Sequence, residues 1–400
     1  MVSSDTLVLD NGACYIKAGL CSQPEPLVMR NAVMKARHER RHSFVGNQID
    51  RCSNLSSLFY MLAFQRGYLV NWDVQKTVWD HMFGEECLAL DSSQHRMLVT
   101  EPCFNFGTVH AATLQMLFEQ YDVPAVLCCR AADVCAVDAL RRDPCRRCCT
   151  VVDAGFSFTH VVPFIDGEAR LEAVRRVDVG GKALTNYAKD IISYRQLHVM
   201  DETHVIAELK EDCCYVTDDW QRDMRLAALP LAQNSIACDY VLPDFSVLRR
   251  GKMRSLQERG GGAAVDGEQL VRLANERFSI PELLFRPSDA GIDQMGVAEA
   301  LMDAVNACPL DARSHLLDNI VLTGGSTKFA GFAQRLQSEV RSMAPDDLQV
   351  RISAPLDPLT HTWHAATRVV DDPLMEKLWL TKKQWEEQGE INNVEATEEE

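Results

Sequence analysis

The sequence has no hydrophobic run long enough to cross a membrane and no basic leader ahead of an apolar stretch. A membrane-spanning helix needs ~18 or more consecutive apolar residues, and no stretch of the 400 residues approaches that length. The chain begins with Met1 and four residues that carry no positive charge, whereas a secretory signal opens with a basic region. We therefore expect neither a membrane protein nor a secreted one.

Positive charge is also in short supply. The chain has 41 Lys and Arg against 57 Asp and Glu, so its formal net charge is −16. Proteins that coat DNA depend on positive potential to neutralise phosphates, and this composition excludes that class for the molecule as a whole. Hydrophobic residues make up 46% of the chain, which suits a folded protein of more than one domain rather than a disordered chain.

Cysteine is abundant, with 15 residues, but the spacing of a four-ligand zinc site is missing. Cys145 and Cys148 form a C-x-x-C pair, no second pair stands in register, and the next histidine, His160, is alone in a strand-like segment. A metal or redox site would therefore rest on this pair alone. Disulfide frameworks belong mainly to small secreted domains, so we expect reduced thiols that pack as small hydrophobic side chains and no metal site.

Two stretches of the sequence, 6–19 and 149–163, share one pattern. Each is an apolar β-type run that ends in Asp, followed by small turn residues and a second β-type run. This pattern predicts a β-hairpin in each stretch. Because one copy is early and the other near mid-chain, the repeat predicts an internally duplicated α/β protein with two facing lobes.

Helical patterns alternate with the strand-like segments. The apolar spacing predicts helices over 109–120 and 183–192, and a third strand–turn–helix unit begins at residue 319. Strands that alternate with helices indicate a mixed α/β architecture. The segment 249–267 contains three consecutive glycines and predicts an exposed loop.

Three glycine-containing turns, at Gly12, Gly155 and Gly324, each follow a strand of buried type. Glycine lets backbone N–H groups approach phosphate oxygens closely, and an Asp at a strand end can hold a hydrated divalent cation. Any one such turn is more often structural than functional. The order and spacing of all three, together with Asp10 and Asp153, are those of the actin family.

The sequence resembles the actin family from residue 6 to about residue 390. The segments at Asp10 and Asp153 resemble its two phosphate loops, that at Lys210 resembles the element contacting ribose and base, and that at Gly324 resembles the turn beside adenine. The resemblance implies the actin-like ATPase fold shared with Hsp70 and sugar kinases, with two duplicated α/β lobes around a central cleft. The nucleotide-binding residues that it implies are Asp10, Asn11, Gly12, Lys17, Asp153, Gly155, Gly181, Lys210, Glu211, Gly324, Gly325, Ser326 and Phe329.

The same resemblance implies the domain boundaries. Residues 1–148 and 345–400 would form the first lobe, with a small, shortened peripheral subdomain at about 30–68. Residues 149–344 would form the second lobe, with a peripheral subdomain at about 181–268.

Departures from the actin pattern fall on the residues that hydrolysis needs. Actins place Ser and Gly after the first Asn-Gly, where this sequence has Ala13 and Cys14; their second loop continues with Asp and Gly, where it has Phe156 and Ser157. Actins also orient the attacking water with a Gln on the helix before the second loop, and residues 128–140 contain none. We therefore expect a degenerate ATPase site with negligible hydrolysis and no catalytic residues.

Within the family, the closest likeness is to a nuclear subfamily, the actin-related proteins of class six. It implies a non-catalytic structural subunit of a nuclear SWR-type chromatin-remodelling complex, which exchanges variant-containing histone dimers and regulates transcription. The implied partners are its other subunits, including the motor ATPase, with a nucleosome or histone contact; the implied location is the nucleus and also the cytoplasm. ATP with magnesium would be a static ligand. The blocks that carry the likeness are 177–196, 208–216, 240–245, 275–285 and 362–363.

An active actin-like ATPase or phosphotransferase is the alternative function. Asp10, Asp153 and the turn at Gly324 favour nucleotide binding, whereas the departures in both phosphate loops oppose hydrolysis. We do not expect self-polymerisation, because the loop that we assign to 29–45 is short and basic. That basic segment is either an ordinary solvated face or a docking patch for an acidic partner or nucleic acid.

Overall fold

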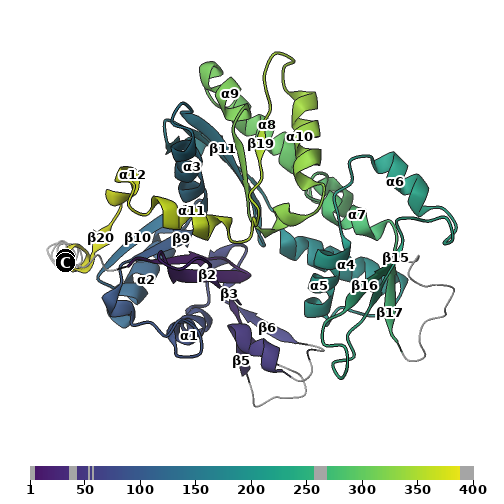
Figure 1. The fold of residues 1–400 in the computed structure, drawn as a ribbon, viewed down its shortest axis with the longest axis horizontal. Coiled ribbons are helices and arrows are strands. Elements are labelled where there is room, and N and C mark those ends of the chain that lie inside the picture. Colours follow the sequence, from purple (N-terminus) through teal and green to yellow (C-terminus); the bar gives the residue numbers. More distant parts are fainter. Residues whose placement is uncertain (1–4, 36–42, 53–54, 56–57, 256–267, 388–400) are drawn as a thin grey trace, which may run out of the picture. The chain divides into compact units, whose positions relative to one another are not determined.

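The structure is a computed structural model that describes residues 5–35, 43–52, 55, 58–255 and 268–387. It divides the chain into two compact units, each built from segments that are far apart in the sequence (Figure 1). Unit 1 comprises Met1–Ala32, Leu62–Pro144 and Thr360–Glu400, and unit 2 comprises Val33–Met61 and Cys145–Leu359. The lobe boundaries given above stay a prediction.

Unit 1 is organised around a mixed sheet in the order β20-β10-β9-β1-β2-β3. Its first two strands form the antiparallel hairpin that the sequence predicts, and β1 pairs in parallel with β9, which pairs in parallel with β10. Parallel strands are buried on both faces and read as continuous apolar runs, as these do. The strands are β1 (Leu7–Asn11), β2 (Tyr15–Leu20), β3 (Leu27–Arg30), β9 (Met97–Glu101), β10 (Ala125–Arg130) and β20 (Leu380–Thr381).

Helices cover both faces of this sheet. α3 packs against α11, and the two are tied by the buried Asp138 carboxylate, which accepts hydrogen bonds from Arg368 at 2.7 and 2.8 Å. Figure 1 shows α1 and α2 on the other side of the sheet. The helices are α1 (Trp72–Phe83), α2 (Gly107–Gln115), which continues as a π-helical turn over Met116–Gln120, α3 (Ala131–Arg142), α11 (His361–Val369) and α12 (Pro373–Glu376).

Unit 2 repeats the strand plan of unit 1. The antiparallel hairpin β11–β12 lies beside β18, β11 and β18 pair in parallel, and β18 pairs in parallel with β19. The predicted duplication is therefore present in the topology. The sheet contains β11 (Cys148–Ala154), β12 (Thr159–Ile165), β13 (Glu168–Ala169), β14 (Arg175–Val177), β18 (Ile320–Thr323) and β19 (Ile352–Ser353).

The helices of unit 2 bury one continuous apolar core against this sheet. The predicted helix over 183–192 is the centre of α4, which begins two residues earlier and ends three later. The helices are α4 (Gly181–Arg195), α5 (Thr203–Cys213), α6 (Trp220–Ala227), α7 (Glu276–Glu282), α8 (Val297–Asn306), α9 (Leu310–Leu317) and α10 (Phe332–Met343).

Short strands lie within two segments that the sequence assigned to loops. The ends of the basic segment 29–45 form strands, and the segment 249–267 includes β16 (Lys252–Ser255), which pairs with β15. Both predictions were wrong there because the pairing partner, not the local sequence, decides whether so short a run is a strand. Residues 36–42 and 256–267 lie outside the described part. The remaining strands are β4 (Ala32–Lys35), β5 (Ser43–Val45), β6 (Phe59–Leu62), β7 (Phe64–Gln65), β8 (Tyr68–Leu69), β15 (Cys238–Val241) and β17 (Leu270–Leu273).

The fifteen cysteines are reduced and form no disulfide bond, and ten of them are buried. Cys145 is exposed while Cys148 is buried in β11, so the two members of the C-x-x-C pair lie in different surroundings. Within the described residues, no helix combines the length and apolar character of a membrane span.

Candidate functional site

The first predicted phosphate loop is the β1–β2 hairpin of unit 1, and a buried ion pair closes it. Asp10 and Lys17 stand opposite each other in the strand register. Their side chains are 9% and 11% exposed, and the Lys17 Nζ lies 3.0 Å from Asp10 Oδ2. The Thr100 hydroxyl, on the neighbouring parallel strand, donates to the other carboxylate oxygen at 2.7 Å. Both oxygens of Asp10 are therefore engaged inside the unit.

Buried amides hold the turn of this hairpin in place. The Asn31 side chain donates to Asn11 Oδ1 at 3.1 Å and to the Gly12 carbonyl at 3.0 Å, and accepts from Gln75 at 3.2 Å. Gly12 must be glycine, because a Cβ there would lie 2.6 Å from the Tyr15 carbonyl oxygen. The structure thus brings together the first four predicted residues. Sequence reasoning missed Asn31 and Gln75, which give no local signal.

The second predicted loop joins β11 to β12 in unit 2, and its backbone carbonyls point at the start of α4. The Gly155 carbonyl accepts the Gly181 N–H at 3.0 Å and the Ser326 hydroxyl at 2.8 Å. The Phe156 carbonyl accepts the Lys182 N–H at 2.8 Å. The N-terminal N–H groups of a helix can bind an anion when they are open. Here two of them are bonded to the turn.

The Phe156 ring lies beside bare backbone at the start of α4. A Cβ on Gly181 would lie 3.5 Å from Phe156 Cδ2, 3.6 Å from Ser326 Oγ and 3.7 Å from Lys210 Nζ. Lys210 is buried, and its ammonium donates to the Gly181 carbonyl at 3.2 Å and to the Thr185 hydroxyl at 3.0 Å. Four of the predicted residues therefore lie close to Phe156, namely Gly155, Gly181, Lys210 and Ser326.

The third predicted turn follows β18 and packs directly on the second. Gly324 has a φ of +90°, and a Cβ there would lie 2.4 Å from the Ala154 carbonyl oxygen and 2.7 Å from Asp153 Oδ1. Only glycine suits both the left-handed conformation and this approach. Gly325 is exposed, and Phe329 is half-buried against the core of unit 2. Glu211 is exposed on α5, and its predicted role in nucleotide binding stays a prediction.

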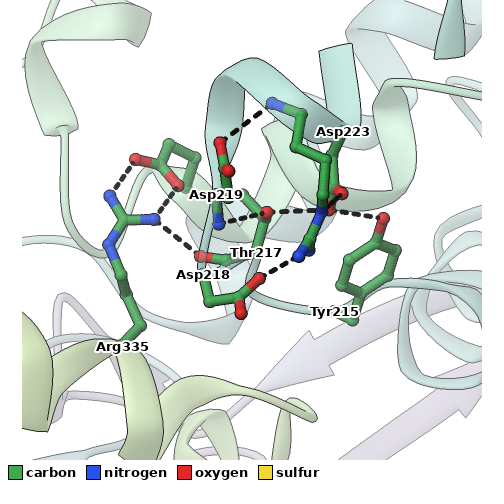
Figure 2. Close-up of polar contacts among 8 residues, drawn as sticks. Tyr215, Thr217, Asp218, Asp219, Asp223 and Arg335 are labelled. Carbon is green, nitrogen blue, oxygen red and sulfur yellow. Dashed lines mark hydrogen bonds and ion pairs between the residues drawn. The ribbon is translucent and has the colours of Figure 1, made fainter. Parts of the chain in front are cut away.

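A buried polar cluster fixes the segment that follows Lys210 (Figure 2). The Thr217 and Tyr215 hydroxyls donate to Asp223 Oδ2 at 2.7 and 3.1 Å. Burial raises the pKa of Asp223, but hydrogen bonds from Thr217, Arg222 and Tyr215 outweigh it and lower that pKa. From α10, Arg335 donates to the Thr217 carbonyl at 2.7 Å. The cluster therefore anchors this segment to two helices.

His160 stands opposite Asp153 in the hairpin register and is buried against the Phe158 ring, with ring centroids 4.3 Å apart. Within the described residues, its Nε2 has no hydrogen-bond partner. Burial, with a smaller contribution from Arg176, lowers the pKa of His160 to about 3. The imidazole is therefore neutral near neutral pH.

The sequence model of the actin family matches residues 1–396. The chain belongs to the actin family.

Relatives that align over nearly the whole chain indicate the subfamily. The chain is 45% identical over 395 residues to a Drosophila melanogaster protein named Actin-related protein 6, an alignment covering 97% of this chain and 98% of that protein. It is 36% identical over 390 residues to Actin-like protein C08B11.6 of Caenorhabditis elegans, covering 97% and 91%. It is 33% identical over 417 residues to Actin-related protein 6 of Arabidopsis thaliana, covering 96% and 97%. These names confirm the predicted likeness to class six.

Replacing Gly324 by Ala tests the close approach of the third turn to Asp153. The added Cβ meets backbone and carboxylate oxygens and is strained at this φ, so we expect Gly324→Ala to lower the free energy of unfolding by ~1–3 kcal/mol. Gly325→Ala is the matched control, because its Cβ would meet only Leu359 Cδ1 at 3.5 Å and should change stability by less than ~0.5 kcal/mol. Urea unfolding compares the two; equal effects would contradict the packing described here.

The depressed pKa of His160 predicts a loss of stability in acid. Between about pH 6.5 and about pH 3 the unfolded state binds a proton that the native state does not, so stability falls as pH falls. We expect this group to remove ~2 kcal/mol between pH 7 and pH 5. In urea unfolding, His160→Leu should not show this loss of stability between pH 7 and pH 5, whereas the control His315→Leu, at an exposed position, should show it as the wild type does. The same pH dependence in all three proteins would disprove the assignment.

Proposed function

We propose that this actin-family chain is a non-catalytic structural subunit of a nuclear SWR-type chromatin-remodelling complex. The complex exchanges variant-containing histone dimers in nucleosomes and so regulates transcription, and a separate motor subunit supplies the ATPase activity. The nucleus is the main location, and the cytoplasm a second one. The chain's partners are the other subunits, including the motor, and it contacts the nucleosome or its histones. It neither polymerises with itself nor binds a membrane.

One observation carries the non-catalytic part of this proposal, namely the turn between β11 and β12. Phe156 stands where actins have a second Asp, and a phenyl ring cannot hold a metal-bound water. The carbonyl groups of the turn accept hydrogen bonds from the Gly181 and Lys182 N–H groups at the start of α4. The turn therefore presents hydrogen-bond acceptors, rather than donors, to the start of this helix. Phosphoryl transfer depends on positioned donors, cations and an oriented water. The turn therefore supports a structural role better than a catalytic one.

ATP with magnesium belongs to the proposal as a static ligand only. In unit 2 the residues that would hold it are Asp153, Gly155 and Gly324, and Asp153 and Gly324 already lie together there. Asp10 differs, because Lys17 and Thr100 engage both of its oxygens. The hairpin of unit 1 is thus charge-compensated by its own residues and needs no cation for that purpose.

The class-six likeness is the ground for the partners and the location. Named relatives in an insect and a plant match nearly the full length of this chain, and the blocks that carry the likeness lie in unit 2 apart from 362–363. Active ATP hydrolysis or phosphotransfer is the competing function. Co-purification of the complex and measurement of phosphate release from ATP separate the two functions.

Purification of the tagged chain from cells tests the proposal. We expect the wild type and Asp153→Asn to co-purify equally with a motor ATPase of the remodelling class and with histone-exchange activity, since assembly does not depend on nucleotide chemistry. The charge-reversal variant Arg37→Glu/Arg40→Glu/Arg41→Glu changes three arginines of the basic segment that lie outside the described residues, and it should reduce assembly more than Asp153→Asn does. A folded Asp153→Asn protein that loses the complex, while the charge-reversal variant keeps it, would contradict a structural role.

A further inference from the structure

One side-chain cluster of unit 1 takes no part in the site described above. Glu101, His110 and Cys128 each offer one metal-ligating atom, and within the described residues these three atoms lie within 4.8 Å of one another. Glu101 ends β9, Cys128 lies in β10, and His110 belongs to α2. The cluster is remote in sequence from the C-x-x-C pair, which does not contribute to it.

Strand register explains why these residues meet. β9 and β10 run in parallel, and Cys128 pairs with Val99, two residues before Glu101. Residues two apart on a strand share a face, so the thiol and the carboxylate lie on the same side of the sheet. α2 crosses that side, and the His110 Nδ1 lies 3.0 and 3.1 Å from the two Glu101 oxygens.

We propose that Glu101, His110 and Cys128 bind a zinc ion, with the fourth coordination position open to solvent. Carboxylate, imidazole and thiolate are all ligands of zinc, and three protein ligands with one open position are a common arrangement. The soft thiolate and the imidazole favour zinc over magnesium or calcium. One carboxylate and one thiolate also balance the 2+ charge of the ion.

The three ligand atoms lie within 4.8 Å of one another, so small side-chain movements would bring them to the distances that zinc requires. Ligand atoms of a tetrahedral zinc ion stand about 3.3–3.8 Å apart, as bonds of ~2.0–2.3 Å require. The histidine and carboxylate already approach more closely than that. The His110 side chain is 44% exposed and that of Glu101 14%, so one ligand faces solvent and gives the ion a route in.

The surroundings of His110 and Cys128 favour the protonated form of each side chain. The hydrogen bond that His110 donates to the Glu101 carboxylate raises the pKa of His110, and burial, with Glu101, raises the pKa of the Cys128 thiol. Because metal ligands bind in their deprotonated form, zinc would displace the Cys128 thiol proton, and the Glu101 carboxylate would bind the ion instead of the His110 N–H. The bound ion would join α2 to the ends of β9 and β10 and stabilise this side of unit 1.

Zinc titration of the full chain tests the proposal. The chain is first dialysed against a chelator, and zinc chloride binding is followed by calorimetry and elemental analysis. We expect one tightly bound zinc per chain in the wild type and in Cys145→Ser, the control for the C-x-x-C pair. His110→Ala and Cys128→Ser should each weaken binding by more than the ~10–100-fold that loss of an outer-shell partner costs. Zinc should also raise the melting temperature of the wild type but not that of His110→Ala.

Cobalt chloride gives a second measurement that identifies the sulfur ligand. Bound Co²⁺ should show a sulfur-to-cobalt charge-transfer band in the wild type and in Cys145→Ser, and this band should vanish in Cys128→Ser. Because His110 is a half-exposed helix residue, His110→Ala is expected to fold even if Cys128→Ser does not, and circular dichroism verifies this before titration. A wild type without tight zinc binding, binding unchanged by His110→Ala, or binding lost in Cys145→Ser would each overturn the proposal.

Discussion

The aspartate near the end of each central strand, buried for Asp10 and half-buried for Asp153, is the constraint on which the two units depend. The duplicated topology places Asp10 at the end of β1 and Asp153 in β11, each beside a parallel strand. A buried ion is tolerated only when charges and hydrogen bonds compensate its lost hydration. In unit 1, Lys17 and Thr100 supply that compensation. In unit 2, Thr323 pairs with Asp153 in the register, and Gly324 lets the next turn approach the carboxylate.

The turn of the second hairpin, between β11 and β12, is held by contacts within unit 2. Its carbonyls bind the first N–H groups of α4, and Lys210 reaches from α5 to the same helix start. These contacts join three elements through the backbone of a turn, and they hold Phe156 beside Gly181. The arrangement stabilises unit 2 by itself. It therefore supports the proposed structural subunit, in which the fold presents surfaces while another protein supplies catalysis.

The sequence predicted the parts of this structure that local pattern controls. Apolar runs ending in Asp identified both hairpins, and helical spacing identified the centre of α4 and most of α2 with the π-helical turn that follows it. Tertiary contacts controlled what it missed. Asn31 and Gln75 meet only after three elements pack, and Glu101, His110 and Cys128 are separated by 9 and 18 positions, which matches no metal-binding spacing.

The central claim is that this actin-family chain does not turn over ATP, and a single-turnover experiment tests it most directly. Purified protein in excess is mixed with ATP labelled on its terminal phosphate and magnesium, and released phosphate is followed for hours. Losing a group that orients water or protons usually costs ~10²-fold or more in rate, and the two loops depart from actin at several such positions. The account predicts phosphate release no faster than in buffer and unchanged by Asp10→Ala. Release at a rate comparable to that of actin, abolished by Asp10→Ala, would contradict it.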